Sequence, residues 1–174
     1  MVVLPEMLKC KEFVNADAIA KGLSPFQPEQ VAIQAGRLML MRIEELLEQR
    51  ADFSLETTLA TRSYVHLIHR VHELDYRVHL LFFWLDSVDL AKKRVQQRVA
   101  EGGHNIKTDV IERRYTAGIR NLITLYLPIC DTVTIMDRSS APVLIATKNS
   151  SNESLKIYDA ERWNKIEKLQ YEKA

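Results

Sequence analysis

The sequence is poor in cysteine and glycine, two residues that often mark special chemistry. It contains only Cys10 and Cys130 among 174 residues. No disulfide framework is therefore expected, and both are interpreted as free thiols of a cytoplasmic protein. None of the five glycines is followed by lysine, so the glycine-rich phosphate-binding loop GxxxxGK[ST] is absent from the sequence.

The sequence also lacks a strong excess of charge and a long apolar segment. Its 24 basic and 23 acidic side chains give a formal net charge of +1, which argues against a general nucleic-acid-binding protein. The longest apolar run, from Val78 to Leu85, is interrupted by His79 and is far shorter than the roughly 20 residues that span a bilayer. Residues 1–4 are too short for a signal peptide and lack a basic flank. We therefore expect neither a nucleic-acid partner nor attachment to a membrane.

Helices and strands alternate along the chain, and 47% of its residues are hydrophobic, enough for a sizeable core. The predicted strands are residues 12–15, 52–56, 76–85, 131–137 and 141–149. The predicted helices are residues 16–22, 28–50, 61–74, 86–99, 108–127 and 160–171. This alternation predicts an α/β fold: a three-layer sandwich in which helices cover both faces of a mostly parallel sheet.

The third and fifth predicted strands differ in their expected surroundings. The inner part of strand 76–85 is apolar on both faces, which is typical of a strand buried on both sides of a parallel sheet. Strand 141–149 is expected to run antiparallel at an edge. We expect one domain over residues 1–149, with residues 150–174 forming a linker and a C-terminal helix packed on the same domain.

Polar groups follow four of the predicted strands, in order Asp17, the segment Glu56–Thr58, Asp86 and Asp137. In α/β proteins, ligands bind outside the carboxyl ends of the strands, so these groups are candidates for a site. Each of the first three also has a structural interpretation. Asp17 and Asp86 would be N-caps of the helices that follow them, and Glu56–Thr58 would be a capping set for the next helix.

Five ordered stretches carry a resemblance to a known family: NADAIAKGLSPF, FSLETTLATRSY, FFWLDSVDLAKKRVQQRV, GGHNI and ERRYTAGIRNL. Together they resemble the zeta-toxin-like P-loop kinases, and more narrowly the bacterial proteins described as predicted ATPases or zeta toxin family proteins. The resemblance extends over nearly the whole chain, as far as IYDAERW.

The resemblance implies a P-loop kinase sheet and ATP-dependent phosphoryl transfer with Mg²⁺. It also implies a first strand and a GxxxxGK[ST] loop, and LPEMLKCKEFVNAD resembles the part of the family that follows this loop. We therefore interpret the sequence as a truncated gene product or one with a mis-assigned start codon. The loss would leave strands 52–56 and 76–85 each with an unpaired edge, and the chain alone is not expected to be an active kinase.

The same resemblance assigns roles to the residues after the first two strands. Asp17 is the general base that takes a proton from a substrate hydroxyl. Glu56, Thr57 and Thr58 correspond to a cluster that binds the acceptor and holds Mg²⁺ through a water. Arg62 would reach an anion of the substrate from the following helix, or else is an exposed surface arginine.

The resemblance places a lid around GGHNI, in which arginines clamp phosphates and stabilise the charge that develops during transfer. The predicted lid residues are Arg94, Arg98, His104, Arg113 and Arg114. Arg98 and Arg114 are the stronger candidates, and a solvated helix face is the alternative for each arginine. His104 stands where more distant zeta toxins carry an arginine, so the toxins' phosphate contacts do not transfer directly to this position.

Three histidines, His66, His69 and His72, recur every three residues on one predicted helix. Zinc-binding pairs on a helix prefer a spacing of four with an acidic partner. We therefore interpret the three as surface or partly buried histidines and predict no metal site built from protein ligands.

Three functions are compatible with these residues. The first is an ATP-dependent kinase acting on the hydroxyl of a small-molecule acceptor. A nucleotide sugar is one candidate, because zeta toxins phosphorylate UDP-N-acetylglucosamine. The second is a non-catalytic pseudokinase or remnant that keeps the acceptor site. The third is a toxin fragment that is bound by an antitoxin protein.

Overall fold

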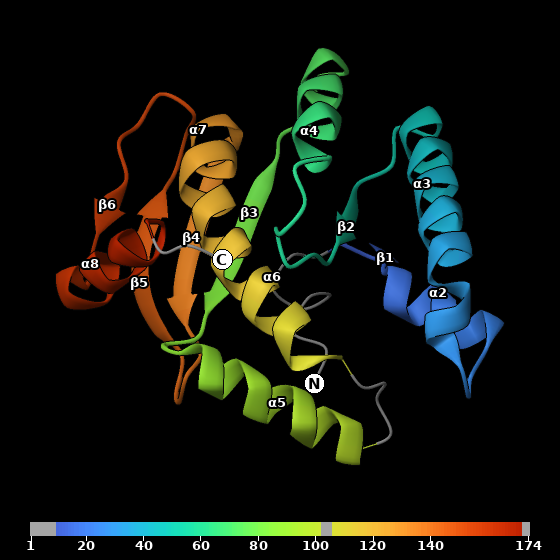
Figure 1. Cartoon of the computed structure of the whole chain (residues 1–174). Coiled ribbons are helices and arrows are strands. Elements are labelled where there is room, and N and C mark those ends of the chain that lie inside the picture. Colours follow the sequence, from blue (N-terminus) through green and yellow to red (C-terminus); the bar gives the residue numbers. More distant parts are fainter. Residues whose placement is uncertain (1–9, 102–105, 172–174) are drawn as a thin grey trace. The chain divides into compact units, whose positions relative to one another are not determined.

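The structure is a computed structural model that describes residues 10–101 and 106–171. The chain divides into two compact units, Met1–Thr57 and Thr58–Ala174. Figure 1 shows the elements of both units in the colours of the sequence, from blue to red. Each unit is described by itself.

The first unit is built on a pair of short parallel strands, β1 (Glu12–Val14) and β2 (Phe53–Leu55), in which Val14 lies opposite Leu55. Helix α2 (Ala16–Leu23), a 3₁₀ turn η1 (Pro28–Val31) and helix α3 (Ala32–Glu48) connect the two strands. The predicted strands and helices of this segment are therefore confirmed in their positions. The bounds differ: α2 continues through Gly22 to Leu23, and the helix predicted for residues 28–50 begins with a 3₁₀ turn and ends at Glu48.

Helix α3 supplies most of the core of the first unit. Its buried residues recur at helical spacing and are Ala35, Met39, Ile43, Leu46 and Leu47. The polar interruption at Arg42 is explained by two ion pairs, since its guanidinium lies 2.9 Å from both Glu12 and Glu45. The pair with Glu12 connects α3 to β1.

The second unit contains a four-stranded sheet in the order β3–β4–β5–β6. Strands β3 (His79–Trp84) and β4 (Thr132–Asp137) are parallel, whereas β5 (Val143–Lys148) and β6 (Lys156–Ile157) continue the sheet in antiparallel fashion. The antiparallel direction of the fifth predicted strand is confirmed. Its edge position is wrong, because the two residues of β6 pair with it from within the predicted linker.

Strand β3 is less buried than its apolar sequence predicts. Only Trp84 is fully buried, and Phe83 is 37% exposed. Pairing is one-sided as well: within the described residues, β4 is the single strand that bonds to β3. The expectation of a strand covered on both faces is therefore wrong for this part of the chain.

Six helical segments of the second unit lie within the described residues, and the four helices predicted for this part of the chain overlap them, with bounds that differ by up to three residues. They are α4 (Tyr64–Glu73), α5 (Val88–Ala100), α6 (Thr108–Asn121), a π-helical turn η2 (Leu122–Tyr126), α7 (Leu127–Ile129) and α8 (Ala160–Leu169). The single long helix predicted for residues 108–127 thus contains a π turn. Helix α8 packs on the core of this unit through Trp163 and Ile166.

Two buried groups lie close to the end of α7. The amine of Lys148 donates a 2.8 Å hydrogen bond to the carbonyl of Leu127, one of the carbonyls that a helix end leaves unpaired. Burial raises the pKa of the Cys130 thiol to about 12 and outweighs the opposing charge of Lys148. Cys130 is therefore an inert core residue at neutral pH.

None of the helices in the described part of the chain is both long enough and apolar enough to cross a bilayer.

Replacement of Ile43 by alanine tests the core of the first unit. Ile43 is 1% exposed, so the cavity left by Ile43→Ala is expected to lower the free energy of unfolding by about 3 kcal/mol. Leu40→Ala is the matched control on the same helix, because Leu40 is 59% exposed and its loss should change stability by less than about 0.5 kcal/mol. Urea unfolding measures both, and equal effects would contradict the described packing of α3.

Candidate functional site

The parallel pair β1–β2 brings two polar residues to one edge of the first unit. Asn15 directly follows β1, and Glu56 directly follows β2. Because Val14 and Leu55 are partners in the parallel register, the next residue of each strand emerges at the same edge. The side-chain amide of Asn15 donates a 2.8 Å hydrogen bond to Glu56 Oε2.

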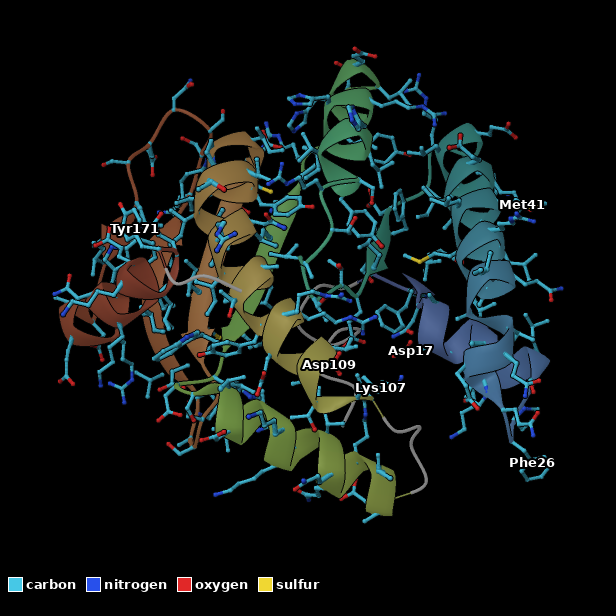
Figure 2. The ribbon with its side chains drawn as sticks, in the orientation of Figure 1. Asp17, Phe26, Met41, Lys107, Asp109 and Tyr171 are labelled. Atoms are coloured by element: carbon cyan, nitrogen blue, oxygen red, sulfur yellow. The ribbon has the colours of Figure 1, made fainter. Side chains whose placement is uncertain are left out.

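The side-chain oxygen of Asn15 also caps helix α2. Its Oδ1 accepts hydrogen bonds from the backbone N–H groups of Asp17 at 2.8 Å and Ala18 at 3.1 Å. The interpretation of Asp17 as the N-cap is therefore wrong, since Asn15 occupies that position. Asp17 lies in the first turn of α2 with an exposed carboxylate (Figure 2), where the positive end of the helix dipole favours a negative charge.

Glu56 keeps one oxygen available at this edge. Its Oε2 is held by Asn15, and Oε1 makes no hydrogen bond to another described residue. The interpretation of Glu56–Thr58 as a capping set for the next helix is wrong, because α4 begins at Tyr64 and Ser63 stands at its N-cap position. The first unit thus presents two exposed acidic residues, and the Asn15 side chain bonds to the carboxylate of Glu56 and to the backbone N–H of Asp17.

The remaining acceptor candidates fall on both sides of the division between the units. Thr57 is half-buried and ends the first unit, whereas Thr58 begins the second. The side chains of Thr58 and Arg62 are exposed in the second unit, and Arg62 precedes α4 rather than lying on it.

The predicted lid arginines lie on α5 and α6. Arg98, Arg113 and Arg114 are exposed and form no side-chain hydrogen bond or ion pair with the residues that the structure describes. Arg94 differs, because its guanidinium donates to the backbone carbonyl of Arg138. The two helices are joined by Lys92 of α5, which lies 2.7 Å from Glu112 of α6. His104 lies outside the described residues.

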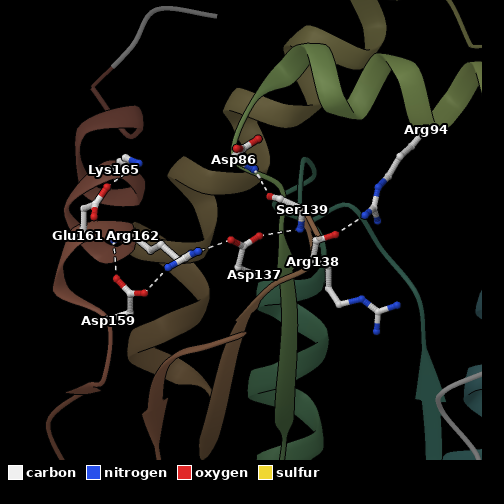
Figure 3. Close-up of polar contacts among 9 residues, drawn as sticks. All are labelled: Asp86, Arg94, Asp137, Arg138, Ser139, Asp159, Glu161, Arg162 and Lys165. Carbon is white, nitrogen blue, oxygen red and sulfur yellow. Dashed lines mark hydrogen bonds and ion pairs between the residues drawn. The ribbon is translucent and has the colours of Figure 1, made fainter. Parts of the chain in front are cut away.

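Asp86 is not the N-cap of the helix that follows it. The hydroxyl of Ser87 occupies this role and accepts from the N–H of Leu90 at 3.3 Å. The N–H of Asp86 instead donates to Ser139 Oγ at 2.8 Å (Figure 3).

Asp137 is a structural carboxylate at the end of β4. It is 4% exposed and accepts hydrogen bonds from Arg162 Nε at 2.8 Å and from the N–H of Ser139 at 2.6 Å (Figure 3). Arg162 also pairs with Asp159, the N-cap of α8. Burial pushes the pKa of Asp137 upward, but the bonds from Ser139 and Arg162 together outweigh it and lower that pKa. Asp137 therefore holds α8 against the sheet.

The histidines of α4 do not converge on a common point. His72 Nε2 lies 2.9 Å from Asp131 Oδ2, whereas His66 and His69 are exposed. Among residues 10–101 and 106–171, no group of three acidic, histidine or cysteine side chains is arranged to hold a metal ion.

Sequence reasoning missed Asn15 and Arg162. An asparagine directly before a predicted helix is a known N-cap signal, and this signal could have identified the role of Asn15 at the helix start. Its hydrogen bond to Glu56 depends on the register of β1 and β2, so no pattern in the neighbouring sequence predicts it. The pairing of Asp137 with Arg162, 25 residues apart, likewise has none.

Comparison with known proteins gives a consistent result. The family model described as zeta toxin matches residues 11–150. A protein of Haemophilus influenzae described as uncharacterized is 29% identical over 102 residues, which are 59% of this chain and 73% of that protein. A solved chain from the PezAT chromosomal toxin–antitoxin system of Streptococcus pneumoniae is similar with a TM-score of 0.57 and 14% identity. That likeness covers 93% of this chain and 67% of the solved one, which confirms the predicted α/β kinase-like fold.

Two substitutions of Asn15 separate its two bonds. Asn15→Ala removes the cap of α2 and should lower the free energy of unfolding by about 1 kcal/mol. Asn15→Ser keeps a capping oxygen but removes the amide donor to Glu56, so most of that stability should be retained. Urea unfolding of both variants measures the difference, and an unchanged midpoint for Asn15→Ala would show that the cap is not formed.

Removal of Arg162 tests the role of Asp137. Arg162→Ala leaves a buried carboxylate without its charged partner and should lower the free energy of unfolding by about 2 kcal/mol at neutral pH. The exposed ion pair of Lys165 with Glu161 on the same helix provides the control, since Lys165→Ala should cost less than about 0.5 kcal/mol. If both variants unfolded at the same urea concentration, Asp137 would not depend on Arg162.

The pH dependence of stability provides a second test of this pair. The folded-state pKa of Asp137 lies below the ordinary value of 3.8, so its interactions stabilise the fold above pH 3.8. This stability is lost as the pH falls from there through the lower folded-state pKa. In Arg162→Ala the acid-induced loss should be smaller than in the unmodified protein, as measured by urea unfolding across this range. An equally steep loss in both would contradict the assignment.

Proposed function

Because the chain belongs to the zeta toxin family, we propose that it forms the acceptor-binding part of a phosphotransferase that modifies a hydroxyl group of a small molecule. The observation that carries this proposal is the edge of the first unit, where Asn15 organises Asp17 and Glu56 at the ends of two parallel strands. A carboxylate at such an edge suits the handling of a hydroxyl nucleophile.

In this proposal Asp17 accepts the proton of the acceptor hydroxyl. Its carboxylate is exposed, so a ligand can reach it, and its backbone N–H is fixed by Asn15, which limits where the side chain can point. Glu56 would orient the acceptor through its available oxygen, and it would be the residue to hold a water of a bound Mg²⁺, since carboxylate oxygens are ligands that Mg²⁺ accepts.

The exposed arginines of α5 and α6 would neutralise phosphate groups. Arg98, Arg113 and Arg114 have no partner among the described residues, so their guanidinium groups are available to an anion. Guanidinium groups bind phosphate oxygens in a two-pronged geometry. The diphosphate of a nucleotide sugar is a ligand of this kind.

The residues of this sequence do not fit the triphosphate half of such a site. A kinase of this type holds the phosphates of ATP with the backbone and lysine of a GxxxxGK[ST] loop, and none of the five glycines here precedes a lysine. We therefore derive no step through ATP, and we propose that these 174 residues alone bind the acceptor but do not transfer a phosphoryl group.

A non-catalytic role is the second candidate. The likeness to a chain from a toxin–antitoxin system favours it. In this role the chain would act through a protein partner such as an antitoxin. Loss of acceptor binding together with retained binding of such a partner would distinguish it from the first proposal.

Calorimetry with two ligands tests the proposed function. UDP-N-acetylglucosamine should bind the chain, and Arg98→Gln or Arg114→Gln should weaken this binding by about tenfold, because each removes a charge-assisted hydrogen bond. Arg37→Gln, an exposed arginine of α3, is the control and should bind like the unmodified chain. Mg·ATP should show no saturable binding.

Two outcomes of this measurement would contradict the proposal. If the UDP sugar does not bind, the acceptor role fails. If Mg·ATP binds to the same 174 residues, the phosphate-binding site must be formed by residues other than a GxxxxGK[ST] loop.

A further inference from the structure

The segment that connects Thr58 to Arg62 contains an unusual backbone conformation. Leu59 has a φ of 56°, a left-handed conformation that is unfavourable for a residue with a branched side chain. Its side chain is 4% exposed and belongs to the core of the second unit. Such a conformation persists only where the surrounding structure enforces it.

The left-handed conformation of Leu59 is enforced by three residues of α6 and the π turn that follows it. Each contacts a backbone carbonyl of the segment Thr58–Arg62. Gly118 of α6 lies against Thr58, and a Cβ atom at position 118 would fall inside 3.0 Å of the Thr58 carbonyl oxygen. The side-chain amide of Asn121 donates to the carbonyl of Leu59 at 2.8 Å. The hydroxyl of Tyr126 donates to the carbonyl of Thr61.

The π turn explains how Tyr126 can join the other two residues. In a regular α-helix, positions 118 and 125 would lie on the same face, because they are seven residues apart. The π turn Leu122–Tyr126 adds one residue to this spacing, so position 126 takes the place of position 125. π turns inside helices occur frequently at functional sites.

None of these three contacts uses a side chain of the segment. All three of the enforcing residues are buried, and each contacts a main-chain oxygen. The side chains of Thr58 and Arg62 remain exposed. The arrangement fixes the backbone of the segment, while Thr58 and Arg62, the two side chains of the segment that the family resemblance assigns to the acceptor, stay exposed.

We propose that Gly118, Asn121 and Tyr126 are positioning residues for the acceptor: by holding the backbone from Thr58 to Thr61, they set the places of Thr58 and Arg62. The inference deepens the proposed function and rests on it. None of the three touches the acceptor itself, and they act through the backbone that carries the residues in contact with it.

Tyr126→Phe and Gly118→Ala test this role. Tyr126→Phe removes only the hydroxyl and keeps the ring in the core, so it remains informative if Gly118→Ala does not fold. The matched control is Tyr115→Phe, because the hydroxyl of Tyr115 on the same helix donates to the carbonyl of Leu85, outside the segment, at 2.7 Å.

Hydrogen exchange gives a readout that does not depend on function. The amides of residues 59–63 should exchange about fivefold faster in Tyr126→Phe, the effect expected for one lost hydrogen bond, and should be unchanged in Tyr115→Phe. Calorimetry with UDP-N-acetylglucosamine gives the second readout: affinity should fall about fivefold in Tyr126→Phe and remain unchanged in Tyr115→Phe.

The outcomes separate this inference from the proposed function. If the unmodified chain binds the UDP sugar and Tyr126→Phe binds it equally well, the positioning role is wrong while the acceptor role stands. Unchanged exchange in residues 59–63 would also overturn it. If the unmodified chain does not bind the UDP sugar, the proposed function fails and the positioning role fails with it, even where exchange shows that the three contacts hold the segment.

Discussion

Parallel strand register is the constraint on which the polar arrangement of both units depends. In the first unit Val14 lies opposite Leu55, and in the second Trp84 lies opposite Asp137. A shift of one residue would turn every side chain of a strand to the other face of its sheet. In the first unit it would remove Glu56 from the reach of Asn15. In the second it would take Asp137 away from Arg162 and release α8. Each short-range polar contact therefore depends on apolar residues that fix the strands.

Much of the fold could be predicted from the sequence because its longer elements have a strong local signal. Strands β3, β4 and β5 and helices α3 and α8 lie where the apolar pattern of the sequence places them, since burial of one stripe or face determines both the sequence pattern and the structure. The shorter features could not be predicted. The two residues of β6 carry no periodicity, and the hydrogen bond from Tyr126 of the π turn to Thr61, 65 residues away, has no local signal in the sequence.

The candidate site was predictable as a set of residues but not as a geometry. Asp17 and Glu56 follow strands and carry an acidic group, so chemistry alone selects them. The interpretation of Asp17 and Asp86 as helix caps was also reasonable, and the structure rejects it because Asn15 and Ser87 cap the helices in their place. Helix-capping statistics favour asparagine, aspartate and serine almost equally. Where such residues are neighbours in the sequence, only the backbone geometry decides which of them caps the helix.

The difference between the two cysteines has a practical consequence for following the motions of this protein. Only the thiolate form reacts with alkylating reagents. Cys10 is partly exposed, whereas Cys130 is buried with a pKa of about 12. A reagent added to the folded protein should therefore modify Cys10 first. It can reach Cys130 only in molecules whose second unit has transiently opened. The rate of the second modification thus reports how often that core opens, without any engineered label.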